Sequence, residues 1–137
     1  MKNIVDLIGR LFLSAVFIFE AIDTLKFYEE TRTALTELNI LWQQDLLLNA
    51  GIVILLLGAI LIATGYRTGF AIIILLVYWL PTTFLVYDFW SFTRGEQRMF
   101  IMLFTKNMAI LGGMLLLWVN GSRAYSIRKI FATTKVR

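Results

Sequence analysis

Uninterrupted apolar segments, separated by short polar ones, dominate the pattern of the chain. Residues 46–66 and residues 68–87 contain no charged side chain. Each segment is about 20 residues long, and a helix of that length spans about 30 Å, the thickness of the hydrocarbon layer of a bilayer. Pattern and length together therefore predict two antiparallel transmembrane helices joined by a tight turn around Arg67.

Two further apolar segments are interrupted by charges. Residues 99–119 contain Lys106, and residues 4–25 contain Asp6, Arg10, Glu20 and Asp23. Charged side chains are costly inside a membrane, so we expect neighbouring helices to shield those of the first segment. A cleaved signal peptide is the alternative for that segment. It has no small-x-small cleavage site leading into a soluble domain, which favours an uncleaved helix.

The pattern as a whole predicts an all-α fold, a four-helix transmembrane bundle. We expect one domain over residues 1–137, with spans at about 4–25, 46–66, 68–88 and 99–119. Between the first two spans, apolar residues recur at helical spacing over residues 34–42, which predicts a short amphipathic helix at the outer interface. Eight of the thirteen basic residues fall on the side of the two termini, so the positive-inside rule places both termini in the cytoplasm.

Small residues predict where the helices approach one another, because backbones in lipid come close only where side chains are small. The glycines with the spacing expected at such contacts are Gly51, Gly58, Gly65, Gly112 and Gly113. Pro81 lies within the third span and removes a backbone hydrogen bond, so we expect a kink there. The hydroxyls of Thr82 and Thr83 can compensate the carbonyl of Val77 that this proline frees.

Composition sharpens the picture of a membrane protein. Hydrophobic residues make up 59% of the chain and charged residues 16%, with a mean hydropathy of +0.77. The net charge of +4 and the basic tail at residues 122–137 predict contact with anionic lipids of the inner leaflet, and no motif points to nucleic acid. The chain contains no cysteine and no histidine. This excludes disulfides, thiolate redox chemistry, iron–sulfur clusters and histidine-ligated haem or zinc, so the sequence predicts no metal site and no catalysis by this chain alone.

Polar residues from all four predicted spans fall within one layer of the outer half of the membrane. They are Glu20, Asp23, Asn49, Asp88, Lys106 and Asn107. A lysine at the centre of a membrane helix costs about 2.5–3.5 kcal/mol on insertion scales. We therefore expect Lys106 to point into the bundle and to pair with Glu20 or Asp88.

Two interpretations of this polar layer remain open. The charges can neutralise one another and determine which helices meet, or they can form a site for a ligand or a proton. The aromatic residues Tyr87 and Trp90 lie at the same end of the bundle and form a wall in the second interpretation. A flat quinone head needs such an apolar slot with one or two polar groups, which makes quinone the candidate cofactor.

Two stretches carry a resemblance to a known family. The segments "PTTFLVYDFW" (residues 81–90) and "TKNMAILGG" (residues 105–113) occur in a chain whose pattern over nearly its whole length resembles the DoxX family. Members of that family commonly have a histidine just before the Asp-Phe-Trp sequence, where this chain has Tyr87.

The resemblance implies a four-helix integral membrane protein of the prokaryotic cytoplasmic membrane. It also implies an accessory subunit of a quinone-linked oxidoreductase complex, with other membrane subunits or further copies of the chain as partners. A structural or assembly protein that packs against partner subunits without a ligand is the alternative. A small transporter is a third possibility, which four spans without an inverted repeat favour least.

Overall fold

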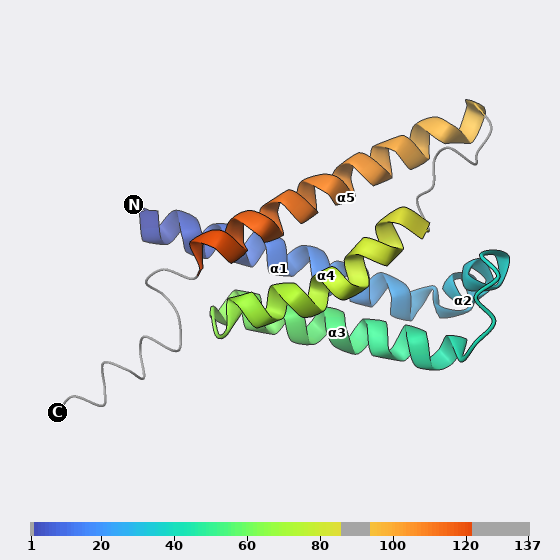
Figure 1. Ribbon diagram of the computed structural model, residues 1–137, viewed down its shortest axis with the longest axis horizontal. Helices are drawn as coiled ribbons and strands as arrows, with labels where there is room; N and C mark the ends of the chain where they lie inside the picture. Colours follow the sequence, from blue (N-terminus) through green and yellow to red (C-terminus); the bar gives the residue numbers. More distant parts are fainter. Residues whose placement is uncertain (1, 86–93, 122–137) are drawn as a thin grey trace.

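A computed structural model of the protein describes residues 2–85 and 94–121, and all regular structure in these residues is helical (Figure 1). The helices are α1 (Lys2–Lys26), α2 (Tyr28–Glu37), α3 (Gln44–Thr64), α4 (Thr68–Leu85) and α5 (Arg94–Asn120). The all-α prediction is thus confirmed. A short helix, α2, does lie between the first two spans, but it ends at Glu37, so it covers only the first part of the predicted residues 34–42. The end of the predicted third span, at residues 86–88, and the basic tail lie outside the described residues.

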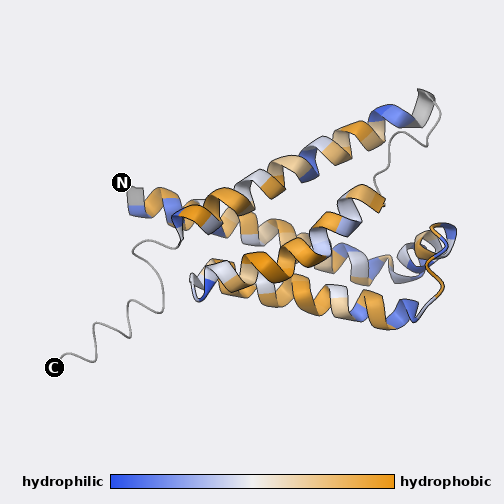
Figure 2. Cartoon of the chain, viewed as in Figure 1, coloured by the Kyte–Doolittle hydropathy of each residue, from blue (hydrophilic) through white to orange (hydrophobic). Residues whose placement is uncertain are grey.

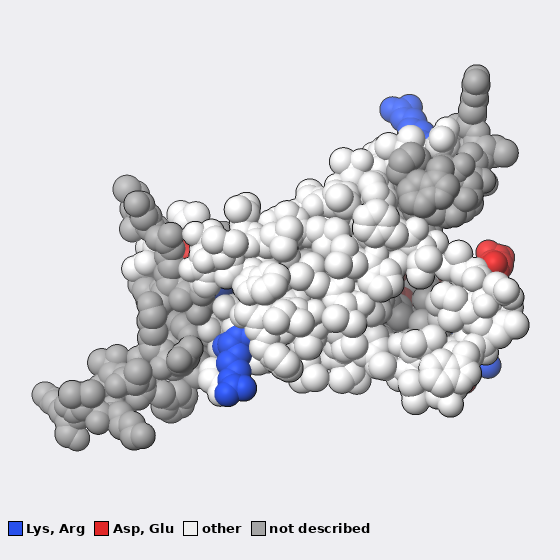
Figure 3. All heavy atoms as spheres, viewed as in Figure 1, with Lys and Arg blue, Asp and Glu red and all other residues white. Residues whose placement is uncertain are grey.

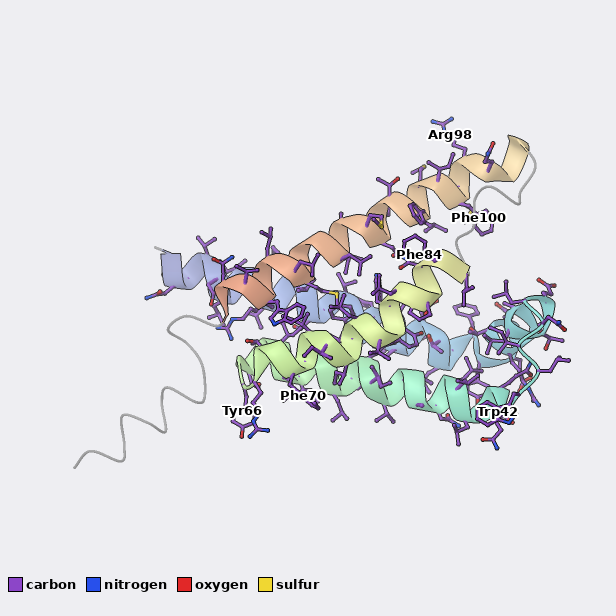
Figure 4. All side chains as sticks on the ribbon, in the orientation of Figure 1. Trp42, Tyr66, Phe70, Phe84, Arg98 and Phe100 are labelled. Atoms are coloured by element: carbon purple, nitrogen blue, oxygen red, sulfur yellow. The ribbon has the colours of Figure 1, made fainter. Side chains whose placement is uncertain are left out.

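Three of these helices are long and apolar enough to cross a membrane: α3, α4 and the Gln97–Asn120 part of α5. These helices are mostly hydrophobic along their length, whereas hydrophilic residues gather on α2, at the helix ends and in one band midway along α5 (Figure 2). On the face shown in Figure 3, the charged side chains lie toward the two ends of the molecule, and uncharged side chains cover the region between them. Trp42 and Tyr66 flank the two ends of α3 (Figure 4), as aromatic residues do at the two interfaces of a membrane. The α1 helix is 25 residues long but carries too many charges to belong to this group.

Close contact between α3 and α4 depends on two glycines. A Cβ atom added at Gly51 would lie 2.6 Å from the ring of Tyr78, and one added at Gly58 would lie 2.5 Å from Leu75. The α3 backbone therefore approaches α4 as closely as glycine allows. Gly65 has a different role from the one expected, because it ends α3 in a left-handed conformation with a φ of 67°.

The helix α4 continues through Pro81 and bends along its course (Figure 1). The Thr82 hydroxyl donates a hydrogen bond of 2.8 Å to the carbonyl of Tyr78. The expected compensation at Val77 is therefore wrong in detail, since the hydroxyl bonds the next carbonyl along. The Thr83 hydroxyl is fully buried and has no hydrogen-bond partner among the described residues.

The helix α1 packs mainly against α3, and its buried face is unusual because most of it is small or polar. That face consists of Arg10, Ser14, Phe17, Ala21 and Thr24, at alternating spacings of four and three residues that place them on one stripe. Apart from Phe17, most of the large apolar side chains of α1 lie on its other faces, with Phe12 and Phe19 more than 70% exposed.

The last helix, α5, lies at an angle to the others (Figure 1). It packs on α4, where the rings of Phe84 and Phe104 meet edge-to-face at a centroid distance of 5.6 Å. It meets α1 only over a short stretch, around Leu13 and Gly113. Only 11% of its membrane-length segment is buried, against 39% for α3. A groove therefore remains between α1 and α5.

Candidate functional site

The groove between α1 and α5 contains a cavity with a volume of about 640 Å³. This lies within the range of about 300–1,000 Å³ typical of small-molecule sites. Its walls are mostly apolar, and three polar residues line it. The α1 wall carries Asp6 and Arg10, and the α5 wall carries Asn120.

Arg10 is the central polar group of this cavity. Its side chain is 1% exposed, and its Nε lies 3.2 Å from the carboxylate of Asp6, one turn earlier on α1. Its Nη1 donates a hydrogen bond of 3.5 Å to the carbonyl of Ala63 on α3. Because the two side chains form an ion pair, their charges sum to zero at the cavity wall.

The local sequence explains this arrangement. Opposite charges four residues apart on a helix lie on the same face and can pair, as Asp6 and Arg10 do. Ala63 lies in the last turn of α3, where backbone carbonyls have no partner within the helix and carry partial negative charge. The guanidinium group thus satisfies a helix end and a carboxylate together, which makes its burial tolerable.

The rest of the cavity wall is apolar. Leu13 and Val16 of α1 face Ile110, Gly113 and Leu117 of α5 across it. Gly113 leaves room there, because a Cβ atom at this position would touch only Leu13, at 3.8 Å. The arrangement can accept a neutral polar head beside Arg10 and Asp6, with an apolar chain along the groove.

The structure scatters the polar layer that the sequence predicts. Glu20 and Asn107 are half-buried, whereas Asp23, Asn49 and Lys106 are exposed. Asp88 and the two predicted aromatic residues, Tyr87 and Trp90, lie outside the described residues.

The expected position of Lys106 needs correction. Its side chain is exposed instead of pointing into the bundle, and no ion pair joins it to Glu20 or to any other carboxylate within residues 2–85 and 94–121. The physical reason is the angle of α5, which follows α4 and separates from α1 toward the end that carries α2 (Figure 1). Two charges at matched depth on α1 and α5 are therefore not in contact.

Glu20 instead lines a second cavity, of about 400 Å³, under α2. Tyr78 and Thr82 of α4 and Thr31 of α2 share this cavity with it. The packing glycines also differ from expectation on α5, since a Cβ atom at Gly112 would meet nothing within 4 Å. Gly112 therefore faces open space and makes no contact with another helix among the described residues.

Comparison with known proteins decides the family. The DoxX family model matches residues 5–88, more than half of the chain. The chain belongs to the DoxX family. With the three membrane-length helices, this makes the protein a small multi-pass integral membrane protein. No curated protein and no solved structure matches the chain.

The cavity of this DoxX protein has one wall inside the matched residues and one wall beyond them. Asp6, Arg10 and the rest of the α1 wall belong to residues 5–88, whereas α5 begins at Arg94. Sequence reasoning missed Arg10 because it treated the residue as one of the basic residues on the cytoplasmic side. The signal that could have found it is the opposite charge four residues earlier in an apolar segment.

The helix α2 of the DoxX protein is held to the start of α3 by polar contacts. Arg32 lies 3.5 Å from the carboxylate of Asp45, and the Tyr28 hydroxyl donates a hydrogen bond of 3.4 Å to the same carboxylate. Desolvation raises the pKa of Tyr28 above its ordinary value, and the negative charge of Asp45 raises the pKa further. These contacts keep α2 over the cavity that Glu20 lines.

Proposed function

We propose that this DoxX protein is an accessory subunit of a quinone-linked oxidoreductase in the prokaryotic cytoplasmic membrane, and that it binds a quinone or quinol between α1 and α5. The observation that carries the proposal is the buried Arg10–Asp6 pair on the wall of a largely apolar cavity. An ionisable pair inside a membrane protein is costly and usually marks a functional site.

The proposal requires α1 to be a fourth membrane span. The distribution of its side chains supports this, because a helix in water buries its apolar side chains and exposes its polar ones. In α1 the buried stripe contains Arg10, Ser14 and Thr24, whereas Phe12 and Phe19 are the most exposed large apolar side chains of the helix. That pattern suits a helix whose outer face contacts lipid and whose polar groups are satisfied inside the bundle.

The chemistry of the pair favours a neutral head group over an ion. The Arg10 guanidinium can donate a hydrogen bond to a quinone carbonyl, and the Asp6 carboxylate can accept one from a quinol hydroxyl. An anionic or cationic head would bring an unbalanced charge to a pair that is already neutral. The chain itself has no cysteine or histidine, so a partner subunit would carry the electrons.

Binding of a short-tailed benzoquinol to the purified protein in nanodiscs tests the proposal. Gly113→Leu fills the cavity, because the first added atom meets only Leu13 at 3.8 Å and the remaining atoms extend into the groove. We expect the affinity of this variant for the quinol to fall at least tenfold. Gly112→Leu is the matched control, since its side chain enters open space and leaves the cavity unchanged.

Two results would contradict the proposal. One is equal quinol binding by the wild type and Gly113→Leu. The other is displacement of the quinol by diacylglycerol at equal concentration, which would make the cavity a groove for ordinary lipid. Purification from the native membrane in mild detergent tests the proposed membership of an oxidoreductase complex, because an accessory subunit is expected to co-purify with redox subunits.

A further inference from the structure

Lys106 raises a question that the cavity does not answer, because an exposed ammonium group on a membrane helix needs a partner. The residue lies nine positions after Gln97, where the membrane-length part of α5 begins, which corresponds to a depth of about 14 Å. It shares a stripe of α5 with Gly113 and Asn120, at spacings of seven residues. Both of those residues line the groove toward α1. Lys106 therefore continues the groove wall of α5 toward the end that carries α2.

The facing wall, on α1, carries the opposite charge at a similar depth. A shallow cavity of about 540 Å³ on α1 is lined by Glu20, Asp23 and Lys26 together with apolar side chains. It shares Val16 with the groove cavity, so it continues the same side of α1. Its two carboxylates and one ammonium group leave one negative charge, which one further lysine would neutralise.

Within one chain these two walls do not meet. The α5 helix begins level with α2, beyond the end of α1, and is held against α4 by the Phe84–Phe104 contact (Figure 1). Among the described residues, neither Glu20 nor Asp23 makes an ion pair, and Lys106 makes none either. Closing the gap inside the chain would require α5 to leave α4.

We infer that the groove side of α1 and α5 is a dimer interface, in which α5 of each copy lies over α1 of the other. A twofold interface uses the same surface on both copies, so it must be complementary to itself. This surface meets that condition, with a cation on α5 and a net negative cavity on α1. Lys106 of each copy then enters the cavity of its partner beside Glu20 and Asp23, at matched depth.

Exchanging the charges of Lys106 and Asp23 tests the interface. Fluorescence energy transfer between labelled copies in phosphatidylcholine vesicles gives the association constant as the protein is diluted in lipid. We expect Lys106→Glu and Asp23→Lys each to lower this constant at least tenfold, and the double variant to recover most of the loss. Lys106→Gln removes the charge without reversing it and is expected to weaken association as well.

Arg98→Glu is the matched control, because it makes the same charge reversal at an exposed position of α5 near the membrane surface. Its association constant should equal that of the wild type. Circular dichroism establishes that each variant keeps its helices. A monomeric wild type would overturn the inference. In that case the ammonium group of Lys106 would extend to the lipid headgroups without a protein partner. Failure of the double variant to recover would overturn it too. Neither readout depends on quinol binding, so this inference and the proposed function fail separately.

Discussion

The contact between α3 and α4 allows a quantitative test at Gly58. A Cβ atom at this position would lie 2.5, 2.6 and 2.7 Å from three side-chain carbons of Leu75, which is completely buried. Carbon atoms in ordinary contact are about 3.5–4.0 Å apart, so the two helices must separate by roughly 1 Å or Leu75 must leave its rotamer. Overpacking of this kind costs about 1–3 kcal/mol. Alanine regains up to about 1 kcal/mol through its higher helix propensity.

Subtracting the propensity gain from the overpacking cost, we expect Gly58→Ala to lower the free energy of unfolding by up to about 2 kcal/mol. Gly112→Ala is the control, because its Cβ atom meets nothing and only the propensity gain remains. Gly51→Ala should fall between them, since the atoms it meets belong to the edge of the half-buried Tyr78 ring, which can move. Reversible unfolding in mixed micelles, followed by far-ultraviolet circular dichroism, measures the three values. Equal stability of Gly58→Ala and Gly112→Ala would refute the close contact.

Two further predictions concern ionisable groups. Asp6→Leu removes the carboxylate beside a guanidinium group that is 1% exposed, so we expect the free energy of unfolding to fall by about 3 kcal/mol. The double variant Asp6→Leu with Arg10→Met should recover most of that loss. Additive effects in a double-mutant cycle would argue against the ion pair. The raised pKa of Tyr28 means that the folded protein retains the phenol proton after the unfolded chain has lost it. Stability should therefore fall as the pH rises above about 10, and a parallel pH profile for Tyr28→Phe would contradict this.

Much of the fold was predictable because it depends on local pattern. Apolar segments of membrane length predict α3, α4 and α5 to within a few residues, and the spacing of seven between Gly51 and Gly58 indicates the face on which α4 packs. Gly65 belongs to the same series but ends a helix. Its spacing alone could not distinguish a contact from a cap, since both roles favour glycine for different reasons.

The candidate site was less predictable because it depends on the angles between helices. Depth along a helix follows from residue number, so a sequence can place Glu20 and Lys106 in one layer of the membrane. Whether two charges in one layer touch depends on how far their helices have separated at that height, which side-chain packing elsewhere determines. Here the α4–α5 contact around Phe84 and Phe104 takes α5 away from α1.

The divergence of α5 from α1 explains why the two halves of the groove differ. Where α1 and α5 are close, Arg10 and Asp6 form an ion pair within the chain, and the cavity beside them is the proposed site of a neutral head group. Where they diverge, Lys106 and Asp23 are each exposed without an ion pair among the described residues. A lone ammonium group in hydrocarbon costs several kcal/mol, and the second copy that we propose would remove that cost without any new kind of residue. The angle of α5 thus accounts both for the open cavity beside Arg10 and Asp6 and for the charged groove surface on which the proposed dimer depends.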